Sequence, residues 1–588
     1  MPPEISRQIA YDRILMTALG ALAGFAAYAL VEILPDHVEN QRIRLFAVTA
    51  TGGFFAALLA AAGPLSYARG ALAAAAAALP AAGLLTWAST RYHNVDVYLE
   101  TIHAPAAYAL IVSISLPFLI AALRPDAGWR HYPTLFRESW NIVVRYAAAW
   151  LFTGVVWAVV ALSDALFGLV GLTVIADLIA IDYVPFLVTG AVLGLALAVV
   201  VELSDYVSPF LILRLLRLLL PVVLVVTAVF LVALPFRGLS NLFGGLSAAA
   251  TLLAMAIGIT TLITSAIDRA DADAAEAIAL RASARLCALA IPVLAALALY
   301  SVWLRVKDYG LSPDRIAAAC AAAVTLGYGV LYTLAVPSRR NWMARIRGAN
   351  IAMALVVAAV AALWLTPVLN PERISAQNQV ARFAAGKVSA AKLDLWFIGK
   401  ELGVAGAEAL DTLASLDHPE AAELAERIER VKSARSRYGF DATEEGLAGP
   451  ELIARILARA AVLPESAQLP AEAFQGMPVS SLQARADGCD RETPKGRPGC
   501  AAIVADFLPA EPGDEILMLW VAASGRVDIG VQSTDSQANR PRVLFLTGSR
   551  AADLLPEDID ALLDEGPTVG PANLLSLKIG EVEVILSP

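Results

Sequence analysis

Eleven long apolar stretches limit the fold of this chain more than any other feature of its sequence. A helix needs roughly 20 mainly apolar residues to cross a membrane, because lipid offers the backbone no hydrogen-bond partners. The first stretch follows Arg7 and Arg13, and its apolar core exceeds the roughly 7–15 residues of a secretory signal, so we expect a retained anchor. The sequence predicts a membrane all-α fold, a polytopic bundle of about eleven transmembrane helices, at Ile14–Leu34, Leu45–Leu65, Gly70–Thr90, Ala106–Leu123, Tyr146–Ser163, Tyr183–Leu203, Leu218–Phe236, Leu246–Ile267, Leu286–Leu304, Ile316–Val336 and Ile351–Leu369.

The composition of the chain changes at Pro371. Residues 1–370 carry 23 Lys and Arg and 20 Asp and Glu between long apolar runs, whereas the mixed sequence of residues 371–588 carries 21 and 33. Charged residues make up only 16% of the whole chain, against about 25% in soluble domains. We therefore expect a transmembrane helical domain at 1–370, a helical segment at 371–465 and a β-rich domain at 466–588.

The basic residues predict the orientation of the bundle, because short cytoplasmic loops are enriched in Lys and Arg. With a cytoplasmic N-terminus, sixteen of the basic residues before Pro371 fall in cytoplasmic segments and seven in the opposite loops. Eleven spans then place the rest of the chain on the outer side. We expect a bacterial inner-membrane protein with a cytoplasmic N-terminus and a soluble periplasmic α+β domain at the C-terminus.

Two of the four cysteines bracket the loop CDRETPKGRPGC, from Cys489 to Cys500, while Cys287 and Cys320 fall inside predicted spans. Disulfides persist in oxidising compartments such as the periplasm. A metal site would need two further ligands, and no His or other Cys stands nearby. We therefore expect a structural disulfide between Cys489 and Cys500, with two unrelated buried thiols as the alternative.

The sequence from Pro371 onward, the tail of the chain, predicts helices followed by short strands. The segments NQVARFAAGK, LDLWFIGKELG and PEAAELAERIERVKSARSRY have helical apolar spacing. From about Gln468 the β-type runs CAAIVADF, EILMLWVAA, RVDIGVQ, RVLFLTG and EVEVILS follow, with ASGR as a hairpin turn. The acidic stretch LPEDIDALLDEG lacks the ligand pattern of a calcium loop, so we expect a solvated helix there.

The segments RVKDYGLSPDR, from Arg305 to Arg315, and NPERISAQNQVARFAAGK, after the last span, resemble parts of a known family. The first is similar to the Tyr-Gly-Leu-Thr-x-x-Arg signature of the bacterial membrane family catalogued as domain of unknown function 4153, with Ser312 in place of Thr. The resemblance covers about the first two thirds of the chain. It implies an inner-membrane protein with many spans, and it carries no established activity.

Standard catalytic motifs are absent from the sequence, and no motif in it predicts a cofactor or a nucleic-acid partner. The segment HNVDVYLETIH holds a weak candidate metal site, because three-, four- and three-residue spacing aligns its acidic and His residues on one helical face. The alternative is the polar face of an interfacial helix. These weak metal candidates are His93, Asp96, Glu100 and His103.

Three basic residues and a tyrosine crowd one short outer loop and form a candidate anion or headgroup site, namely Arg305, Lys307, Tyr309 and Arg315. A helix N-terminus beside them favours an anion. Two alternatives stay open. Asp308 and Asp314 neutralise the basic charge locally, or Ser312 and Pro313 do no more than start the tenth span.

Two outer connections, 164–182 and 237–247, are unusually apolar. They are interfacial helices or re-entrant segments that line a cavity. Few charges fall inside the predicted spans, and Arg214 and Arg217 are expected to reach the cytoplasmic surface with their long side chains. This scarcity disfavours a coupled pump and leaves a passive or lipid pathway open.

The sequence therefore predicts a non-catalytic envelope protein of uncharacterised activity. Our leading hypothesis is that it handles or moves an amphiphilic or anionic envelope substrate in contact with membrane lipid. The alternative is a structural or sensory protein whose periplasmic domain docks a periplasmic or membrane protein. A ligand-sized cavity among the spans would favour the first hypothesis, and a large apolar patch on the tail the second.

Overall fold

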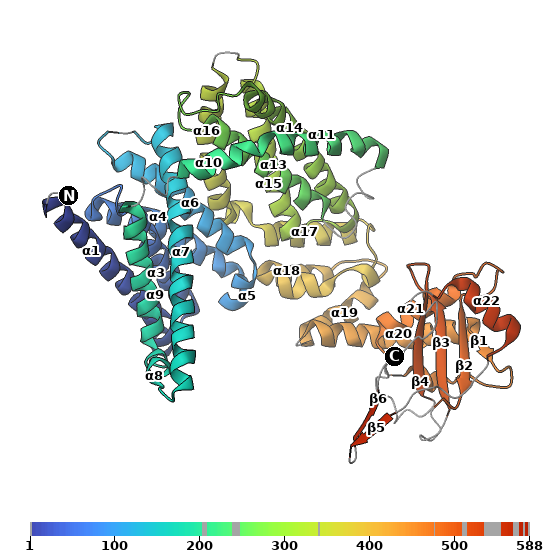
Figure 1. The fold of residues 1–588 in the computed structure, drawn as a ribbon. Helices are drawn as coiled ribbons and strands as arrows, with labels where there is room; N and C mark the ends of the chain where they lie inside the picture. The colour runs from blue at the N-terminus through green and yellow to red at the C-terminus, as the bar shows by residue number, and fades with distance from the viewer. Residues whose placement is uncertain are drawn as a thin grey trace. The chain divides into compact units, whose positions relative to one another are not determined.

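The protein is described by a computed structural model (Figure 1), which forms two units, Met1–Ile428 and Glu429–Pro588. The structure describes residues 3–126, 128–202, 209–237, 247–338, 341–434, 436–475, 477–507, 514–533, 554–567, 576–579 and 582–585.

Eleven helices in the described part of the first unit are long and apolar enough to cross a membrane, which confirms the predicted helical bundle. The seventh span combines two helices, and a π-helical turn, Ala29–Ile33, and a short helix α2 (Leu34–His37) extend the first. The span helices are α1 (Pro3–Tyr28), α3 (Gln41–Ala61), α4 (Tyr67–Ala88), α6 (His103–Leu123), α7 (Tyr132–Leu169), α9 (Tyr183–Glu202), α10 (Pro209–Leu218) with α11 (Leu220–Arg237), α13 (Ala248–Ile267), α14 (Ile278–Tyr309), α15 (Pro313–Ala335) and α16 (Trp342–Trp364).

Short polar side chains start several of these helices. Asn40 accepts hydrogen bonds from two backbone amides at the start of α3, and Ser312 accepts one from the Arg315 amide, 3.3 Å away, at the start of α15. Such caps satisfy amides that have no partner inside the helix. Ser312 therefore caps the helix of the tenth span.

Glycines bring α1 and α9 into backbone contact. A Cβ atom on Gly20 would lie 2.1 Å from the Gly190 carbonyl oxygen, and one on Gly194 would lie 2.2 Å from the Met16 oxygen. Gly24 meets the Phe186 oxygen in the same way. Small residues four apart let membrane helices approach this closely. The first span is therefore held by the sixth, which is far away in sequence.

The first helices after Asn370 belong to the same unit as the spans. These are α17 (Pro371–Ala384) and α18 (Gly403–Ala414), while α19 (Ala421–Ser433) reaches the unit boundary. The two units divide after Ile428, within α19. We call the end of the bundle at which α16 finishes and α17 begins the tail end, and the opposite end the far end.

The second unit has the predicted α+β character. A four-stranded sheet has the order β1-β2-β3-β4, in which β1 and β2 are parallel and the other neighbours antiparallel. Gly525, at φ +81°, turns the chain between β3 and β4, so the ASGR hairpin is confirmed. The elements are α20 (Arg437–Arg459), β1 (Ala461–Leu463), α21 (Val479–Asp490), β2 (Cys500–Ala505), β3 (Glu515–Val521), β4 (Val527–Ser533), α22 (Pro556–Glu565), β5 (Ser576–Ile579) and β6 (Val582–Ile585).

Some expected segments have other outcomes. The stretch LPEDIDALLDEG forms α22, as predicted, whereas RVLFLTG lies outside the described residues. The connection 164–182 contains the end of α7, a turn and the short helix α8 (Val174–Ile179), with strongly exposed side chains such as Leu169. In connection 237–247, residues 238–246 lie outside the described residues.

Candidate functional site in the helix bundle

A cavity of about 530 Å³ lies among four helices of the bundle, α6, α13, α15 and α16. This volume is within the range of small-molecule sites, roughly 300–1,000 Å³. Most of the lining side chains are apolar, and small alanines provide much of the space. The lining residues are His103, Ala106, Ala107, Leu110, Ile257, Thr260, Thr261, Ala317, Cys320, Ala321, Val324, Thr325, Tyr328, Val357, Val360, Ala361 and Trp364.

The cavity runs obliquely from the tail end toward the middle of the bundle. At the tail end, its wall contains the first residue of α6, His103, and the last residue of α16, Trp364. Its deepest lining residue on α15 is Tyr328, which lies fifteen residues after Pro313 and hence about 22 Å along the helix at 1.5 Å per residue. Leu110 and Ile257 are 43% and 52% exposed, so the cavity is accessible from the side of the bundle, between α6 and α13.

A histidine and a carboxylate stand at the mouth of the cavity. Nε2 of His103 lies 2.7 Å from Oδ1 of Asp314, which follows the N-cap of α15. The His103 ring also meets the Trp364 ring edge-on at 5.5 Å. Asp314 is largely exposed, whereas the His103 side chain is only 22% exposed. The polar end of the cavity therefore lies at the tail end of the bundle.

A hydrogen-bond network lies beyond the deep end of the cavity. The buried Tyr332 hydroxyl donates to Oδ1 of Asn350 at 2.5 Å and lies 3.2 Å from the Thr264 hydroxyl. The Asn350 amide donates to the Tyr132 hydroxyl at 3.0 Å. This network joins α7, α13, α15 and α16. It gives hydrogen-bond partners to polar groups whose burial without partners would destabilise the bundle.

Ion pairs made by two mostly buried arginines hold the far end of the bundle together. Arg217 donates to Asp268 at 2.8 Å, with side-chain exposures of 11% and 2%. Arg347 donates to Asp271 at 2.6 Å and to two backbone oxygens at the end of α13. Burial raises the pKa of Asp268, which also has an unusual positive φ of 53°. Arg217 therefore pairs with Asp268 at the far end of the bundle, where its side chain is mostly buried.

At the tail end, the two quoted family-like segments contact each other. The backbone N–H of Leu311 donates to Oδ1 of Asn378 at 2.8 Å, and Nε2 of Gln379 donates to the Tyr309 oxygen at 3.2 Å. Arg382 donates to the last carbonyl oxygens of α14, those of Lys307 and Asp308, at 2.8 and 2.6 Å. The loop YGLS is therefore the docking site of α17.

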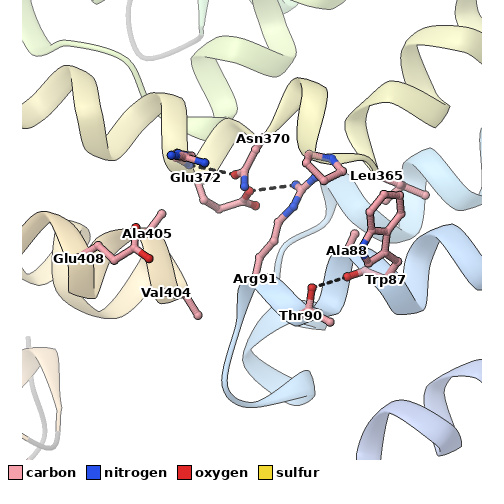
Figure 2. A pocket seen from close by; sticks show the side chains of 12 residues that line it. Trp87, Ala88, Thr90, Arg91, Leu365, Asn370, Glu372, Val404, Ala405 and Glu408 are labelled. Carbon is pink, nitrogen blue, oxygen red and sulfur yellow. Dashed lines mark hydrogen bonds and ion pairs between the residues drawn. The ribbon is translucent and has the colours of Figure 1, made fainter.

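A polar pocket of about 210 Å³ lies at the same end (Figure 2). Within it, Nη1 of Arg91 donates to Glu372 at 3.0 Å, and Nη2 donates to the oxygens of Trp364 and Thr366, each at 2.8 Å. The Arg91 and Glu372 side chains are 10% and 6% exposed. The pair therefore joins the loop after α4 to the first turn of α17, and both groups are already engaged.

A family model described as "Domain of unknown function (DUF4153)" matches residues 54–413. The chain belongs to this family. The match extends past the last span and ends within α18, so the DUF4153 domain includes the two helices that dock on the tail end of the bundle. No curated protein and no solved structure matches the chain.

The candidate anion residues of the DUF4153 domain are only partly available. Nη1 of Arg315 donates to the Gly310 oxygen at 2.8 Å, and its guanidinium lies 5.6 Å from the centre of the Tyr309 ring. Lys307 lies 5.9 Å from the centre of the Trp303 ring. The structure thus engages Arg315 in shaping the loop that receives α17, and an anion site at Arg305, Lys307, Tyr309 and Arg315 stays a prediction.

The weak metal candidates do not share one helical face. The helix α5 covers only Val95–Glu100, so His93 precedes it and His103 begins the next helix. Asp96 accepts a long hydrogen bond from Gln41, at 3.4 Å, and His103 pairs with Asp314. Among the described residues, no group of three or more His, Cys, Asp and Glu side chains could hold a metal ion.

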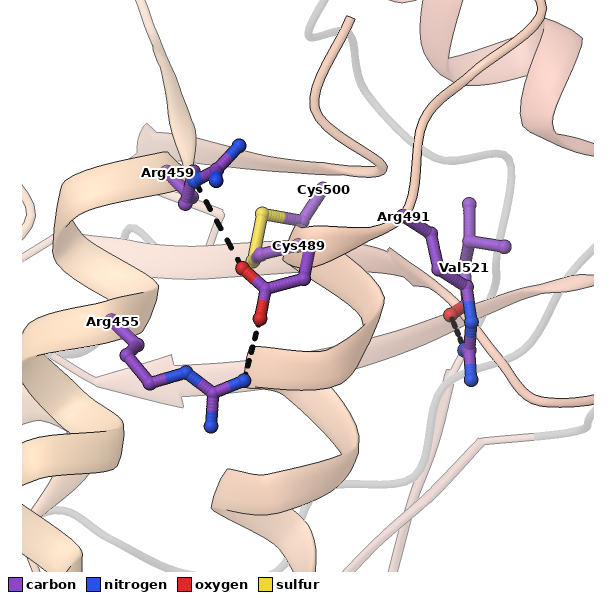
Figure 3. The surroundings of a disulfide bond; sticks show 7 residues. Arg455, Arg459, Cys489, Arg491, Cys500 and Val521 are labelled. Atoms are coloured by element: carbon purple, nitrogen blue, oxygen red, sulfur yellow. Dashed lines mark hydrogen bonds and ion pairs between the residues drawn. A yellow bond between two sulfur atoms is a disulfide. The ribbon is translucent and has the colours of Figure 1, made fainter.

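In the second unit, a disulfide joins Cys489 at the end of α21 to Cys500 at the start of β2 (Figure 3). The Cα atoms lie 4.7 Å apart, within the range that disulfides require. Next to it, Arg455 donates to Asp490 at 2.5 Å (Figure 3). Oxidation of this pair in the native membrane stays a prediction.

The basic loop between the cysteines lies against the acidic helix α22. Thr493 donates to Asp560 at 2.7 Å, and Arg497 donates to Asp564 at 2.5 Å. Lys495 also pairs with Asp564, and these contacts hold the pKa of that carboxyl below its usual range. The basic loop between the cysteines and the acidic helix α22, which are distant in the sequence, are therefore neighbours in the folded structure.

Proposed function

We propose that this DUF4153 protein binds a membrane amphiphile in the cavity of α6, α13, α15 and α16 and handles it as a substrate or cargo. The observation that supports the proposal is the cavity itself, whose lining is mainly apolar and whose mouth holds His103 and Asp314. An apolar body would lie among the alanines and valines, with its polar end at the tail end of the bundle.

The wall of the cavity favours an amphiphile over a purely anionic substrate. None of its lining residues is Lys or Arg. A negatively charged group would therefore be desolvated without a partner, which is unfavourable. An apolar chain gains little from leaving lipid for protein, because both are apolar, so we expect the shape of the cavity and its few polar groups to select the ligand.

We place the protein in a bacterial inner membrane, with the N-terminus in the cytoplasm and the tail in the periplasm. The sixteen-to-seven distribution of basic residues supports this orientation. The mouth of the cavity would then face the periplasm, and the Arg217–Asp268 pair would face the cytoplasm. The cavity would take an amphiphile from the side, between α6 and α13, from the surrounding lipid.

The docking hypothesis has less support. Among the described side chains of the second unit, Phe507 and Leu555 are the large hydrophobics that are clearly exposed, at 36% and 40%. Two separate side chains do not form the extended apolar patch that marks a binding surface. We therefore retain the amphiphile hypothesis as the proposed function.

A cavity-filling variant tests the proposal. Ala321 lines the cavity and is exposed, and Ala323, on the same helix, is also exposed and is not among the lining residues. We expect Ala321→Trp to reduce the amount of copurifying lipid, measured by native mass spectrometry of gently solubilised protein. Ala323→Trp should retain the wild-type amount. Equal lipid retention by both variants, with equal thermal stability, would refute binding in this cavity.

A further inference from the structure

Tyr328 is the one polar side chain deep in the cavity whose hydroxyl has no hydrogen-bond partner among the residues that the structure describes. Its ring packs edge-on against Tyr332, with centroids 6.0 Å apart, but the hydroxyl of Tyr332 is bound to Asn350 and Thr264 whereas that of Tyr328 is not. We infer that Tyr328 donates a hydrogen bond to an uncharged oxygen of the bound amphiphile, such as that of an ester or an alcohol. This inference rests on the proposed function.

The other hydroxyls of the wall cannot serve as donors in this way. Thr260 donates to the Ala256 oxygen at 2.8 Å, and Thr261 donates to the Ile257 oxygen at 3.0 Å. Thr325 donates to the Ala321 oxygen at 2.7 Å. Each threonine uses its single proton inside its own helix and keeps only acceptor capacity. Tyr328 is therefore the available donor at this depth.

The surroundings of Tyr328 disfavour a charged partner. The lining residues include no Asp, Glu, Lys or Arg. A position about 22 Å along α15 lies inside a hydrocarbon core of roughly 30 Å. A charge there needs an opposite charge or a water-filled cavity, whereas an ester or alcohol oxygen needs one donor. The geometry therefore selects a ligand that has an apolar segment and a neutral oxygen far from its headgroup end.

A matched pair of probes tests the inference on the full-length protein. Methyl oleate has no separate headgroup to bind at the mouth, so its terminal ester can enter the cavity and reach Tyr328, and octadecene is a hydrocarbon of similar length without oxygen. In nanodiscs, we expect Tyr328→Phe to weaken methyl oleate binding about three- to tenfold, the effect of one neutral hydrogen bond, and to leave octadecene binding unchanged. Tyr300→Phe, which changes an exposed tyrosine on α14, should leave both unchanged.

The outcomes separate the inference from the proposed function. If wild-type protein and Tyr328→Phe bind methyl oleate equally, and Ala321→Trp loses both probes, the cavity binds amphiphiles and the role of Tyr328 is overturned. If wild-type protein binds neither probe, the proposed function and the inference both fail. Selective loss of methyl oleate in Tyr328→Phe alone supports both.

Discussion

Gly310 allows the sharpest test of how the loop YGLS, residues 309–312, holds α17. Its backbone has φ +78° and ψ −176°, a conformation that is essentially restricted to glycine. A Cβ atom there would lie 2.7 Å from Cδ of Arg382 and 2.8 Å from Nε2 of Gln379. Gly310→Ala therefore strains the backbone and displaces the side chains of α17 that contact the loop.

The magnitude follows from two contributions. Backbone strain at such a position costs about 1–3 kcal/mol. Displacing these side chains also breaks the hydrogen bonds of Asn378 and Gln379 to the loop, each worth about 1 kcal/mol. We expect Gly310→Ala to lose about 3–5 kcal/mol of stability in total.

Gly386 provides the matched control. It has φ +64°, and a Cβ atom there would meet nothing within 4 Å, so Gly386→Ala should cost only the left-handed strain of about 1–2 kcal/mol. The assay is thermal unfolding in detergent, combined with trypsin cleavage after Arg382, which should accelerate in Gly310→Ala. If Gly310→Ala is no less stable than Gly386→Ala, contact between the loop and α17 does not hold the tail end together.

Four other predictions concern different parts of the chain. Gly190→Leu should lower the melting temperature, because overpacking costs about 1–3 kcal/mol and the new Cβ atom would lie 2.1 Å from the Gly20 oxygen; an unchanged melting temperature would show that α1 is free to shift. Cys489→Ser should destabilise the second unit by about 3 kcal/mol, the expected effect for a loop of similar length, and free thiols in protein from native membranes would contradict the disulfide. The basic partners of Asp564 lower the pKa of its carboxyl. Its contribution to stability is therefore complete above the unfolded pKa of about 3.9 and is lost as the pH falls through the lower pKa of the folded state. Asp564→Asn should be less stable than wild type at neutral pH and equally stable in strong acid, and a difference that persists in acid would refute this. A periplasm-dependent reporter fused after Pro588 should be active and one fused after Arg340 silent, and the reverse pattern would refute the proposed orientation.

The sequence was sufficient for the spans because each depends on local composition. Eleven runs of apolar residues identify eleven helices whatever their neighbours are. The hairpin around Gly525 was equally local, since a positive φ between two β-type runs needs little else. Boundaries were less accurate: α7 runs from Tyr132 to Leu169, well beyond the predicted apolar run.

The candidate site could not be read in this way, because it is built from residues far apart in the chain. His103 meets Asp314, and Arg217 meets Asp268, only after the helices have packed. The alanines of the cavity wall look like those of any apolar span. The sequence did carry a signal for a different contact, that of the first and sixth spans, namely glycine pairs four residues apart such as Gly20 and Gly24.

The glycine contact between α1 and α9 also has a consequence for biogenesis. Gly190 is synthesised 170 residues after Gly20, which takes about 10–30 s at 5–20 residues per second. During that interval α1 has entered the membrane without the partner whose backbone it later contacts. Its close-packed face must meanwhile be covered by lipid, by the insertion machinery or by a neighbouring span. During membrane assembly, α1 therefore stays without its partner helix until the sixth span leaves the insertion machinery and can pack against it.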